Sequence, residues 1–484
     1  MISIQNFSFQ YHHTQSNCLN NIHLNIQDGE CVLLCGRSGC GKTTIIRLIN
    51  GLIPQFYQGK MNGKVQIDGK DIFQIPMYEL SKKIGSVFQN PRTQFFNIDV
   101  DSEIAFGIEN QGMPENQIQQ RVQSTMTDLH IEDLSGLKLH DLSGGEKQKI
   151  AFASTYAMDN DIYLLDEPSS HLDHQATKSL HDYIQILKNK KKTIVIAEHR
   201  LYYLIDLVDK IVYMDHGKIQ IYTPQELMNL SIQQRKKMGL RTLSLQDLTW
   251  TQKTKKSSDY ATLVFDRLSL FYQQKCVLQD ISLQARRGEV IGVIGANGVG
   301  KSTFSRSICG LHKKKTGDIL WEGQKKNDKE CMRLSYMVMQ DVNYQLFADS
   351  VYEECCLGIK DPHQQIIEET LDILDLQEYR DCHPNTLSGG QKQRVAVAVS
   401  MICQKDLLVF DEPTSGLDYD SMQQVSDFIQ KVAQMGKVVF VVTHDYEFLC
   451  QCCYRVLHFD KGRLCHDLIM NEDSKPLLNH LFQI

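Results

Sequence analysis

A glycine-rich octapeptide pattern occurs twice in this chain and constrains its fold more than any other feature. GRSGCGKT occupies residues 36–43, and GANGVGKS occupies residues 295–302. Both fit G-x-x-x-x-G-K-[ST], in which glycines let backbone N–H groups wrap closely around phosphates. A structural glycine turn is the alternative interpretation, but both copies stand in the same local setting, which favours phosphate binding.

That setting is a strand, the loop and a helix. The apolar runs CVLLCG (31–36) and EVIGVIG (289–295) predict buried strands that lead into the loops. TIIRLING (44–51) and TFSRSICG (303–310) predict helices that leave them, each ending at a glycine. This arrangement points backbone N–H groups and a helix N-terminus at phosphate.

The loop chemistry predicts the nucleotide contacts. We expect Lys42 and Lys301 to reach the β- and γ-phosphates of ATP, and Thr43 and Ser302 to hold Mg²⁺. The residues expected to contact the nucleotide are Gly36, Arg37, Ser38, Gly39, Cys40, Gly41, Lys42, Thr43 and Thr44 in the first loop, and Gly295, Ala296, Asn297, Gly298, Val299, Gly300, Lys301, Ser302 and Thr303 in the second.

The repeat extends well beyond the loops. DLSGGEKQK (141–149) matches TLSGGQKQR (386–394), and IYLLDEPSSHLD (162–173) matches LLVFDEPTSGLD (407–418). The spacing between matching residues falls from 259 at the loop lysines to 245 at these later motifs, and their order never changes. This is a duplicated domain. We predict domains at residues 1–223 and 261–470, a linker at 224–260 and a C-terminal tail at 471–484.

Composition narrows the class of protein. A net charge of −6 argues against a general nucleic-acid binder, and no run of 18 apolar residues is present. The N-terminus MISIQNFSFQYHH lacks the basic start and apolar core of a signal peptide, so we expect a cytosolic chain. The 15 cysteines show no two CxxC pairs at the spacing of a zinc site and are expected to act as small hydrophobic residues.

The loop, a later glutamine, LSGG, the D-E-P box and a late histidine occur in this order, twice. In this the chain resembles the ATP-binding cassette (ABC) ATPases. The resemblance implies an α/β fold: two tandem P-loop NTPase domains, each with a mixed, largely parallel sheet, crossover helices and a helical subdomain that carries LSGG. It also implies that two cassettes pair head to tail around two ATP molecules, here as a pseudodimer within one chain.

The resemblance assigns roles to the residues that the two copies share. Asp166 and Asp411 would bind Mg²⁺, and Glu167 and Glu412 would polarise the attacking water as general bases; a structural pair of acids is the alternative. A carboxylate is needed because water is a poor nucleophile. His199 and His444 would contact the γ-phosphate, unless they are core histidines. Gln89 and Gln340 would sense Mg²⁺ and the attacking water.

Two further groups complete each predicted site. Ser143, Gly144 and Gly145 in one copy, and Ser388, Gly389 and Gly390 in the other, start helices whose N–H groups would meet the γ-phosphate bound by the opposite copy. A plain N-cap is the alternative. Tyr11 and Tyr272 stand where the family stacks an aromatic ring on adenine; a core tyrosine is the alternative. The copies differ at His171 and Gly416, so equal turnover at the two sites stays open.

The stretches after the glutamines resemble one branch of the family. FQNPRTQFFNIDVDSEIAFGIEN (88–110) and MQDVNYQLFADSVYEECCLG (339–358) are similar to the matching stretch of energy-coupling factor (ECF) transporter ATPases, as is AEHRLYYL (197–204). Their apolar residues Phe95, Phe96, Phe347, Ile104 and Phe106 suit a groove for helices of a membrane subunit; core packing is the alternative.

The resemblance therefore implies an ATPase subunit of a membrane importer at the cytoplasmic face of the membrane. Expected partners are a transmembrane coupling subunit and a small membrane subunit that captures the cargo, which is a vitamin, with a thiamine precursor ranked first, or a metal ion. We expect no direct cargo binding and no nucleic acid. The alternatives are another ABC transporter type, or a soluble ABC ATPase that acts on ribosomes or nucleic acid.

Overall fold

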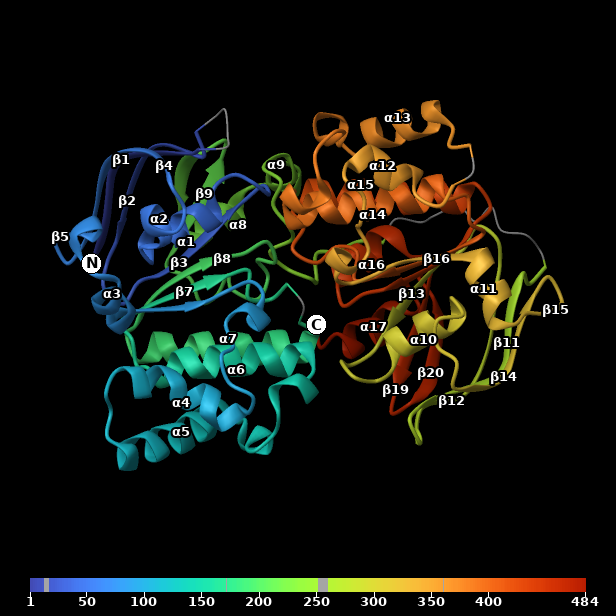
Figure 1. Ribbon diagram of the computed structural model, residues 1–484, viewed down its shortest axis with the longest axis horizontal. Helices are drawn as coiled ribbons and strands as arrows, with labels where there is room; N and C mark the ends of the chain where they lie inside the picture. Colours follow the sequence, from blue (N-terminus) through green and yellow to red (C-terminus); the bar gives the residue numbers. More distant parts are fainter. Residues whose placement is uncertain (13–16, 171, 251–259, 360) are drawn as a thin grey trace. The chain divides into compact units, whose positions relative to one another are not determined.

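The chain forms two compact units, Met1–Ser244 and Leu245–Ile484 (Figure 1). The computed structural model describes residues 1–12, 17–170, 172–250, 260–359 and 361–484. Each unit contains one six-stranded and one four-stranded sheet with the same strand order in both units. The predicted duplication of an α/β domain with a largely parallel sheet is confirmed.

The six-stranded sheet of the first unit carries the glycine loop. Its order is β10 (Lys218–Tyr222), β9 (Lys210–Asp215), β3 (Cys31–Gly36), β8 (Thr193–Ala197), β7 (Ile162–Asp166) and β6 (Ile84–Val87), with only β10 antiparallel. Every residue of β3, β7 and β8 is buried, as expected for parallel strands covered on both faces. The parallel strands bring their carboxyl ends, and the residues that follow them, to one edge of the sheet.

The two faces of this sheet have different cover. On one face, α1 (Lys42–Ile49) packs against the four-stranded sheet of β2 (Leu19–Ile26), β1 (Ile2–Tyr11), β4 (Gly59–Ile67) and β5 (Lys70–Asp71). The other face packs on α4 (Val100–Asn110), α5 (Glu115–Leu129), α6 (Gly144–Ala157) and α7 (His174–Asn189) (Figure 1). The shorter helices are α2 (Leu52–Gln55), α3 (Met77–Lys83), α8 (Pro224–Asn229) and α9 (Ile232–Lys237).

The second unit repeats this architecture. Its six-stranded sheet is β16 (Ser335–Val338), β17 (Leu407–Asp411), β18 (Val438–Val442), β13 (Val290–Ile294), β19 (Arg455–Asp460) and β20 (Arg463–Ile469). Its four-stranded sheet is β12 (Lys275–Ala285), β11 (Leu263–Tyr272), β14 (Lys315–Trp321) and β15 (Gln324–Lys325). Its helices are α10 (Lys301–Ile308), α11 (Asp328–Leu334), α12 (Val351–Cys356), α13 (Gln364–Ile373), α14 (Gly389–Ile402), α15 (Tyr419–Gln434), α16 (Tyr446–Cys452) and α17 (Lys475–Leu481).

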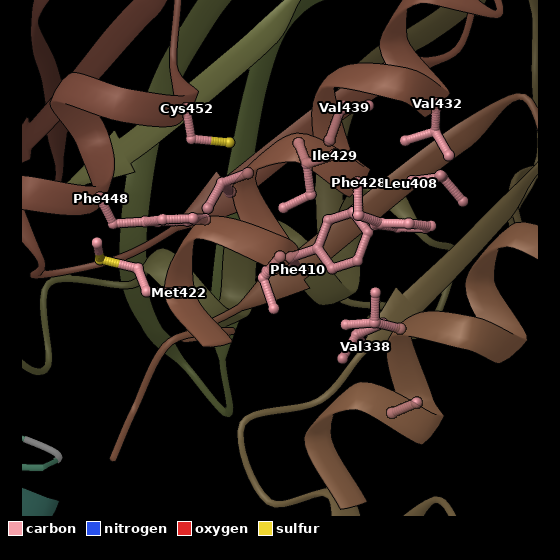
Figure 2. Close-up of a cluster of buried hydrophobic side chains, with 14 of the residues drawn as sticks. Val338, Leu408, Phe410, Met422, Phe428, Ile429, Val432, Val439, Phe448 and Cys452 are labelled. Atoms are coloured by element: carbon pink, nitrogen blue, oxygen red, sulfur yellow. The ribbon is translucent and has the colours of Figure 1, made fainter. Parts of the chain in front are cut away.

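Aromatic and aliphatic side chains fill the core between the β17–β18 sheet and α15. Phe410 of β17 meets Phe428 of α15 edge-on, with ring centroids 6.5 Å apart, and Cys452 of α16 lies in the same cluster (Figure 2). All three side chains are at most 1% exposed. Burying one phenylalanine contributes about 1.5–3 kcal/mol. The cluster thus stabilises the position of β17, the strand that ends at Asp411.

The predicted linker and tail both contain helices. In the stretch 224–260, α8 and α9 belong to the first unit, whereas Leu245, Leu248 and Trp250 pack on the core of the second. Residues 251–259 lie outside the described residues. In the tail, Leu478 of α17 and Phe482 are buried in the second core. Among the described residues, no helix is both long enough and apolar enough to cross a bilayer.

Candidate functional site

The glycine loop of the first unit joins β3 to α1 at the carboxyl edge of the sheet. Gly36 and Gly41 have φ angles of 137° and 109°, which L side chains rarely adopt. A Cβ atom at Gly36 would lie 2.1 Å from the carbonyl oxygen of Met214, and one at Gly41 would lie 2.9 Å from that of Cys18. Both positions therefore require glycine, for conformation and for space.

The loop lysines adopt the same conformation in both units. Lys42 Nζ donates to the carbonyl oxygens of the first two loop residues, each at 3.0 Å, and Lys301 does the same at 2.8 and 2.9 Å. The helices that follow begin at Gly41 and Gly300, which make no side-chain cap hydrogen bond. A buried ammonium and the N–H groups of a helix N-terminus therefore converge on each loop, which fits the phosphates of a nucleotide.

The remaining predicted loop residues lie in the same strand–loop–helix segments. These are Ser38, Gly39, Cys40 and Thr44 in the first unit, and Asn297, Gly298, Val299 and Thr303 in the second. Arg37 and Ala296, which match in the repeat, differ in their contacts. Arg37 reaches away from the loop and donates to the carbonyl oxygen of Lys237 at 2.7 Å. This bond ties the first loop to the end of α9.

A hydroxyl and a carboxylate meet beside each loop. Thr43 Oγ1 donates to Asp166 Oδ1 at 3.1 Å, and Ser302 hydrogen-bonds to Asp411. Burial and the adjacent Glu167 charge raise the pKa of Asp166 to about 6, while the bond from Thr43 opposes them. Burial likewise raises the pKa of Asp411. Because hydroxyl and carboxylate oxygens are ligands that Mg²⁺ accepts, both pairs fit this cation.

Each glutamate of the D-E-P box lies close to the predicted histidine. Glu167 and Glu412 have φ angles of 46° and 52°, a strained region for a side chain of this size. Glu167 Oε1 lies 3.6 Å from His199 Nε2, and Glu412 Oε1 lies 3.5 Å from His444 Nε2. Their backbone N–H groups donate to the ends of β8 and β18 at 2.8 and 2.9 Å. The two copies therefore hold this glutamate in the same backbone conformation.

The two predicted glutamines differ. Gln89 Nε2 donates to Glu167 Oε2 at 2.6 Å, so it belongs to the same cluster as the glutamate and His199. Gln340 is exposed, and the second histidine bonds instead to Asn297, with 3.0 Å between His444 Nε2 and Asn297 Oδ1. The first unit therefore brings glutamine, glutamate and histidine together, whereas the second brings asparagine, glutamate and histidine together.

The LSGG serines are N-caps of long helices. Ser143 starts α6 and Ser388 starts α14, and each forms a capping box with the residue three positions later. Gly144 and Gly389 follow in helical conformation, and a Cβ atom at either would meet nothing within 4 Å. Gly145 is buried, and a Cβ at Gly390 would lie 3.2 Å from Leu417 Cδ2. Packing within the unit therefore does not require glycine at Gly144 or Gly389.

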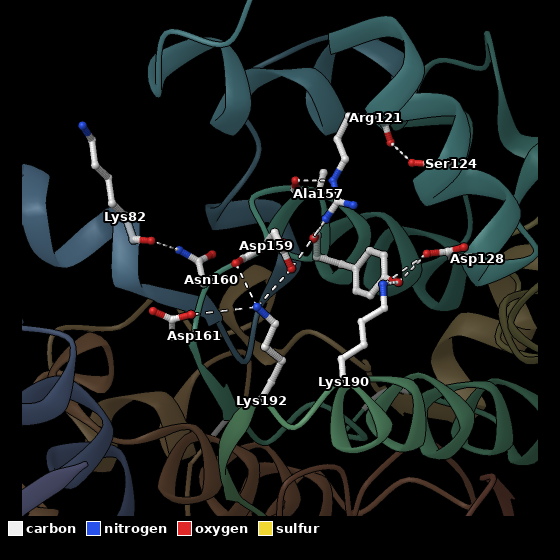
Figure 3. Close-up of polar contacts among 11 residues, drawn as sticks. Lys82, Arg121, Ser124, Asp128, Ala157, Asp159, Asn160, Asp161, Lys190 and Lys192 are labelled. Carbon is white, nitrogen blue, oxygen red and sulfur yellow. Dashed lines mark hydrogen bonds and ion pairs between the residues drawn. The ribbon is translucent and has the colours of Figure 1, made fainter. Parts of the chain in front are cut away.

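The far end of α6 is tied to its neighbours by a polar network (Figure 3). Arg121 of α5 donates to the carbonyl oxygens of Tyr156 and Ala157 at 3.0 and 2.8 Å. Lys192, at the start of β8, pairs with Asp159 at 3.0 Å. A cation on the terminal carbonyls is favourable at a helix C-terminus. The network thus fixes the helix whose opposite end carries Ser143.

The two tyrosines predicted to stack on adenine have different surroundings. Tyr272 ends β11 and is 66% exposed. Tyr11 ends β1 and is half-buried; its hydroxyl lies 3.2 Å from Thr44 Oγ1 and accepts a bond from Arg47 at 3.3 Å. Both residues flank their loops, but only Tyr272 presents most of its ring to solvent.

Sequence reasoning missed a pair of buried glutamates. Glu103 of α4 and Glu354 of α12 are each 2% exposed. Glu103 Oε2 accepts from the backbone N–H groups of Phe96 and Asn97 at 3.0 and 2.8 Å, and Glu354 Oε2 accepts from those of Phe347 and the next residue, both at 2.7 Å. An acid at the fourth residue of one helix and at the matching place of its repeat was the signal. His171 lies outside the described residues.

The comparisons with known proteins agree with this geometry. The family model for ABC transporter matches residues 19–170 and 278–415. A putative ABC transporter ATP-binding protein of Treponema denticola is 47% identical over 475 residues, which is 97% of each chain. Another of the same description from Clostridium perfringens is 32% identical over 513 residues, covering 96% of this chain and 90% of that protein.

Solved structures show the same fold at low identity. The archaeal ribosome recycling factor aABCE1, in complex with ribosomal stalk protein aP1, superposes with a TM-score of 0.68 and 22% identity over 98% of this chain and 92% of that one. At this identity the likeness concerns the fold alone. The family match and the close relatives decide the classification: the chain belongs to the ABC transporter family, as an ABC ATPase with two ABC domains.

Proposed function

We propose that this chain is the ATP-hydrolysing subunit of a membrane importer of ECF type. It would act at the cytoplasmic face of the membrane, with a transmembrane coupling subunit and a small substrate-binding subunit as partners. The observation that carries the proposal is a matched pair of exposed phenylalanines, one in each ABC domain, at the positions where ECF ATPases are expected to meet a membrane subunit.

The clusters beside the loops support a hydrolytic role. Each loop, with Lys42 or Lys301, would hold the phosphates, and bound Mg²⁺ would neutralise charge on them. Thr43, Asp166 and Gln89 would hold that ion in the first domain, and Ser302, Asp411 and Gln340 in the second. We assign Glu167 and Glu412 as general bases that accept a proton from the attacking water. His199 and His444 lie 3.6 and 3.5 Å from these carboxylates and would contact the γ-phosphate.

The signature glycines support composite ATP sites. Glycine at Gly144 and Gly389 is unexplained by packing within either unit, whereas a phosphate approaching the helix N-terminus would need the space. We therefore propose an intramolecular pseudodimer in which Ser388 completes the site of Lys42 and Ser143 completes that of Lys301. Tyr11 and Tyr272 would contact adenine.

The surface beside the glutamines supports a membrane partner. Phe96 and Phe347 are 74% and 72% exposed, although each is held in place by a buried glutamate. Phe96 stacks on Phe106, with centroids 4.9 Å apart, at the rim of a pocket of about 340 Å³ that Met77 and Phe88 also line. Exposed aromatic residues held in a fixed position indicate a protein interface, and an apolar groove suits a helix.

The cargo follows from the ECF assignment. In this arrangement the small membrane subunit captures a vitamin, with a thiamine precursor ranked first, or a metal ion, and this chain makes no contact with it. ATP binding would close the pseudodimer, hydrolysis would reopen it, and the phenylalanine surfaces would pass the motion to the coupling subunit.

The test is capture of the tagged chain from detergent-solubilised membranes of its own host without added ATP, followed by mass spectrometry. We expect two small polytopic proteins in near-stoichiometric yield. Replacing both Phe96 and Phe347 with Ser should abolish their recovery. Met435→Ser, which changes a residue 71% exposed at the end of α15, is the matched control and should leave recovery unchanged.

Other outcomes would redirect the assignment. Recovery of a single large transmembrane protein would favour another ABC transporter type. Recovery of ribosomal proteins or nucleic acid without any membrane protein would contradict the importer and favour a soluble ABC ATPase. The assignment as an ABC ATPase would stand in both cases.

A further inference from the structure

The residues on either side of the late histidine differ in charge between the two ABC domains. Glu198 and Arg200 flank His199 and are 2% and 7% exposed. In the second domain the matching positions are Thr443 and Asp445, a hydroxyl and a carboxylate in place of a carboxylate and a cation. Buried charges are costly unless they are hydrogen-bonded, so the pair in the first domain must have specific partners.

The Glu198 carboxylate accepts four hydrogen bonds. Oε1 accepts from the backbone N–H groups of His199 at 2.7 Å and Arg200 at 3.2 Å. Oε2 accepts from the N–H of Ser169 at 3.2 Å and from the hydroxyl of Tyr203 at 2.9 Å. Bonds to an ionised acceptor are stronger than neutral ones. One side chain thus joins the end of β8 to the loop that connects β7 with α7.

Arg200 holds the same loop from its carbonyl side. Its Nη1 donates to the carbonyl oxygens of Ser169 at 3.4 Å and Leu172 at 3.2 Å. Both contacts reach from the end of β8 to carbonyl groups two and five residues after Glu167. The two residues that flank His199 therefore bind one N–H group and two C=O groups of the β7–α7 loop.

The second domain uses different contacts at the matching positions. Thr414 Oγ1 donates to Asp445 Oδ2 at 3.1 Å, and the N–H of Asp445 donates to Thr443 Oγ1 at 3.1 Å. Asp445 also caps α16 by accepting from the N–H of Phe448 at 3.2 Å. In the second domain the hydrogen bond between the two segments joins the side chains of Thr414 and Asp445. In the first domain the side chains of Glu198 and Arg200 bond to the backbone of the loop.

We propose that Glu198 and Arg200 are positioning residues for the first ATP site only. They clamp the β7–α7 loop to the end of β8 and so hold His199 beside Glu167. The proposal rests on the assignment of Glu167 and His199 as catalytic residues. Glu167 occupies a strained conformation with the clamped loop directly after it, so release of the loop would let the carboxylate move from its position 3.6 Å from His199.

The first test is Glu198→Gln in the otherwise unchanged chain. Glutamine has the shape of glutamate but only one accepting oxygen, so one of the two pairs of bonds is lost. Because small misplacements of a catalytic group cost large factors in rate, ATP turnover should fall to that of the Glu167→Gln chain, within about twofold. The KM for ATP should stay within about threefold, since the glycine loop is untouched.

The second test uses chains with one silenced site. In the Glu412→Gln chain, adding Glu198→Gln should lower kcat about tenfold or more. In the Glu167→Gln chain the same addition should change kcat by less than about twofold. Glu226→Gln, on a capping glutamate of α8 in the same unit, is the matched control and should leave turnover unchanged. If Glu198→Gln does not fold, Arg200→Lys is judged by the same criteria, because it keeps the charge but cannot match the reach of guanidinium.

Distinct results separate this proposal from the site assignment. Normal turnover in Glu198→Gln, an equal loss in both silenced chains, or loss of ATP binding would each overturn the clamp. If the Glu167→Gln and Glu412→Gln chains themselves turn over normally, the catalytic assignment fails and the clamp fails with it.

Discussion

The buried Glu103 allows the strength of one surface feature to be worked out. Its Oε2 atom accepts from the backbone N–H groups of Phe96 and Asn97, and also from the Asn97 side chain at 3.3 Å. Hydrogen bonds to a charged group contribute about 1.5–3 kcal/mol each. In Glu103→Ala the two backbone bonds are lost together, so the loop that presents Phe96 should be destabilised by about 3–6 kcal/mol.

The assay is amide hydrogen exchange on the intact chain. Because about 1.4 kcal/mol corresponds to a factor of ten, protection of the Phe96 and Asn97 amides should fall by about 10²- to 10⁴-fold, or to the unprotected limit. Glu103→Gln keeps a neutral acceptor and should show a smaller fall. Glu109→Ala, on the exposed face of the same helix, is the control.

A clear result would refute this reasoning. If protection of both amides in Glu103→Ala stays within about threefold of the unmodified chain, the carboxylate does not hold the loop. The same substitution should also weaken capture of the membrane partner, because Phe96 would no longer be held in place. Retained capture with a released loop would show that the loop need not be held in position for binding.

Three further predictions concern other parts of the chain. Gly144→Ala and Gly389→Ala should leave the melting temperature unchanged or slightly raised, because a Cβ atom at either position meets nothing within 4 Å. Both substitutions should nevertheless lower ATP turnover. Unaffected turnover would argue against composite ATP sites. Glu167→Gln and Glu412→Gln should each lower hydrolysis at their own site about 10²- to 10⁴-fold, and near-normal turnover in either would show that its site is not hydrolytic. Burial lowers the pKa of His181, but hydrogen bonds with two aspartates outweigh this effect, so the pKa is raised overall. The protonated His181 therefore stabilises the folded chain fully below the unfolded-state pKa of about 6.5, and this stabilisation is lost as the pH rises through the folded-state pKa. His181→Gln should thus lower the melting temperature more at pH 6 than at pH 8, and an equal loss at both would contradict this.

Much of the fold follows from local sequence. The apolar runs around Leu33 and Val293 could be assigned as buried strands because parallel strands covered on both faces are apolar throughout. The glycine loops could be assigned because few residue types tolerate the φ angles seen at Gly41 and Gly300. The repeat then turned each single motif into a pair with matched spacing.

Where the repeat is imperfect, sequence reasoning was less reliable. It treated Gln89 and Gln340 as equivalent, whereas in the structure Gln89 bonds to Glu167 and Asn297 contacts the second histidine. It also grouped Tyr11 with Tyr272, although one is tied to Thr44 and the other is exposed. Such differences depend on side-chain packing, which a shared motif does not specify.

By itself, then, the sequence determined the duplicated α/β fold, the glycine loops and the order of aspartate, glutamate and histidine, because these are written in short contiguous motifs. Only the tertiary structure decided how they are held. Glu198 reaches Ser169 across 29 residues of chain, and Glu103 binds backbone N–H groups that carry no side-chain signal. The left-handed backbone of Glu167 likewise arises where β7 ends beside β8. Contacts to backbone depend on where strands and loops meet in space, and residue identity alone does not encode that position.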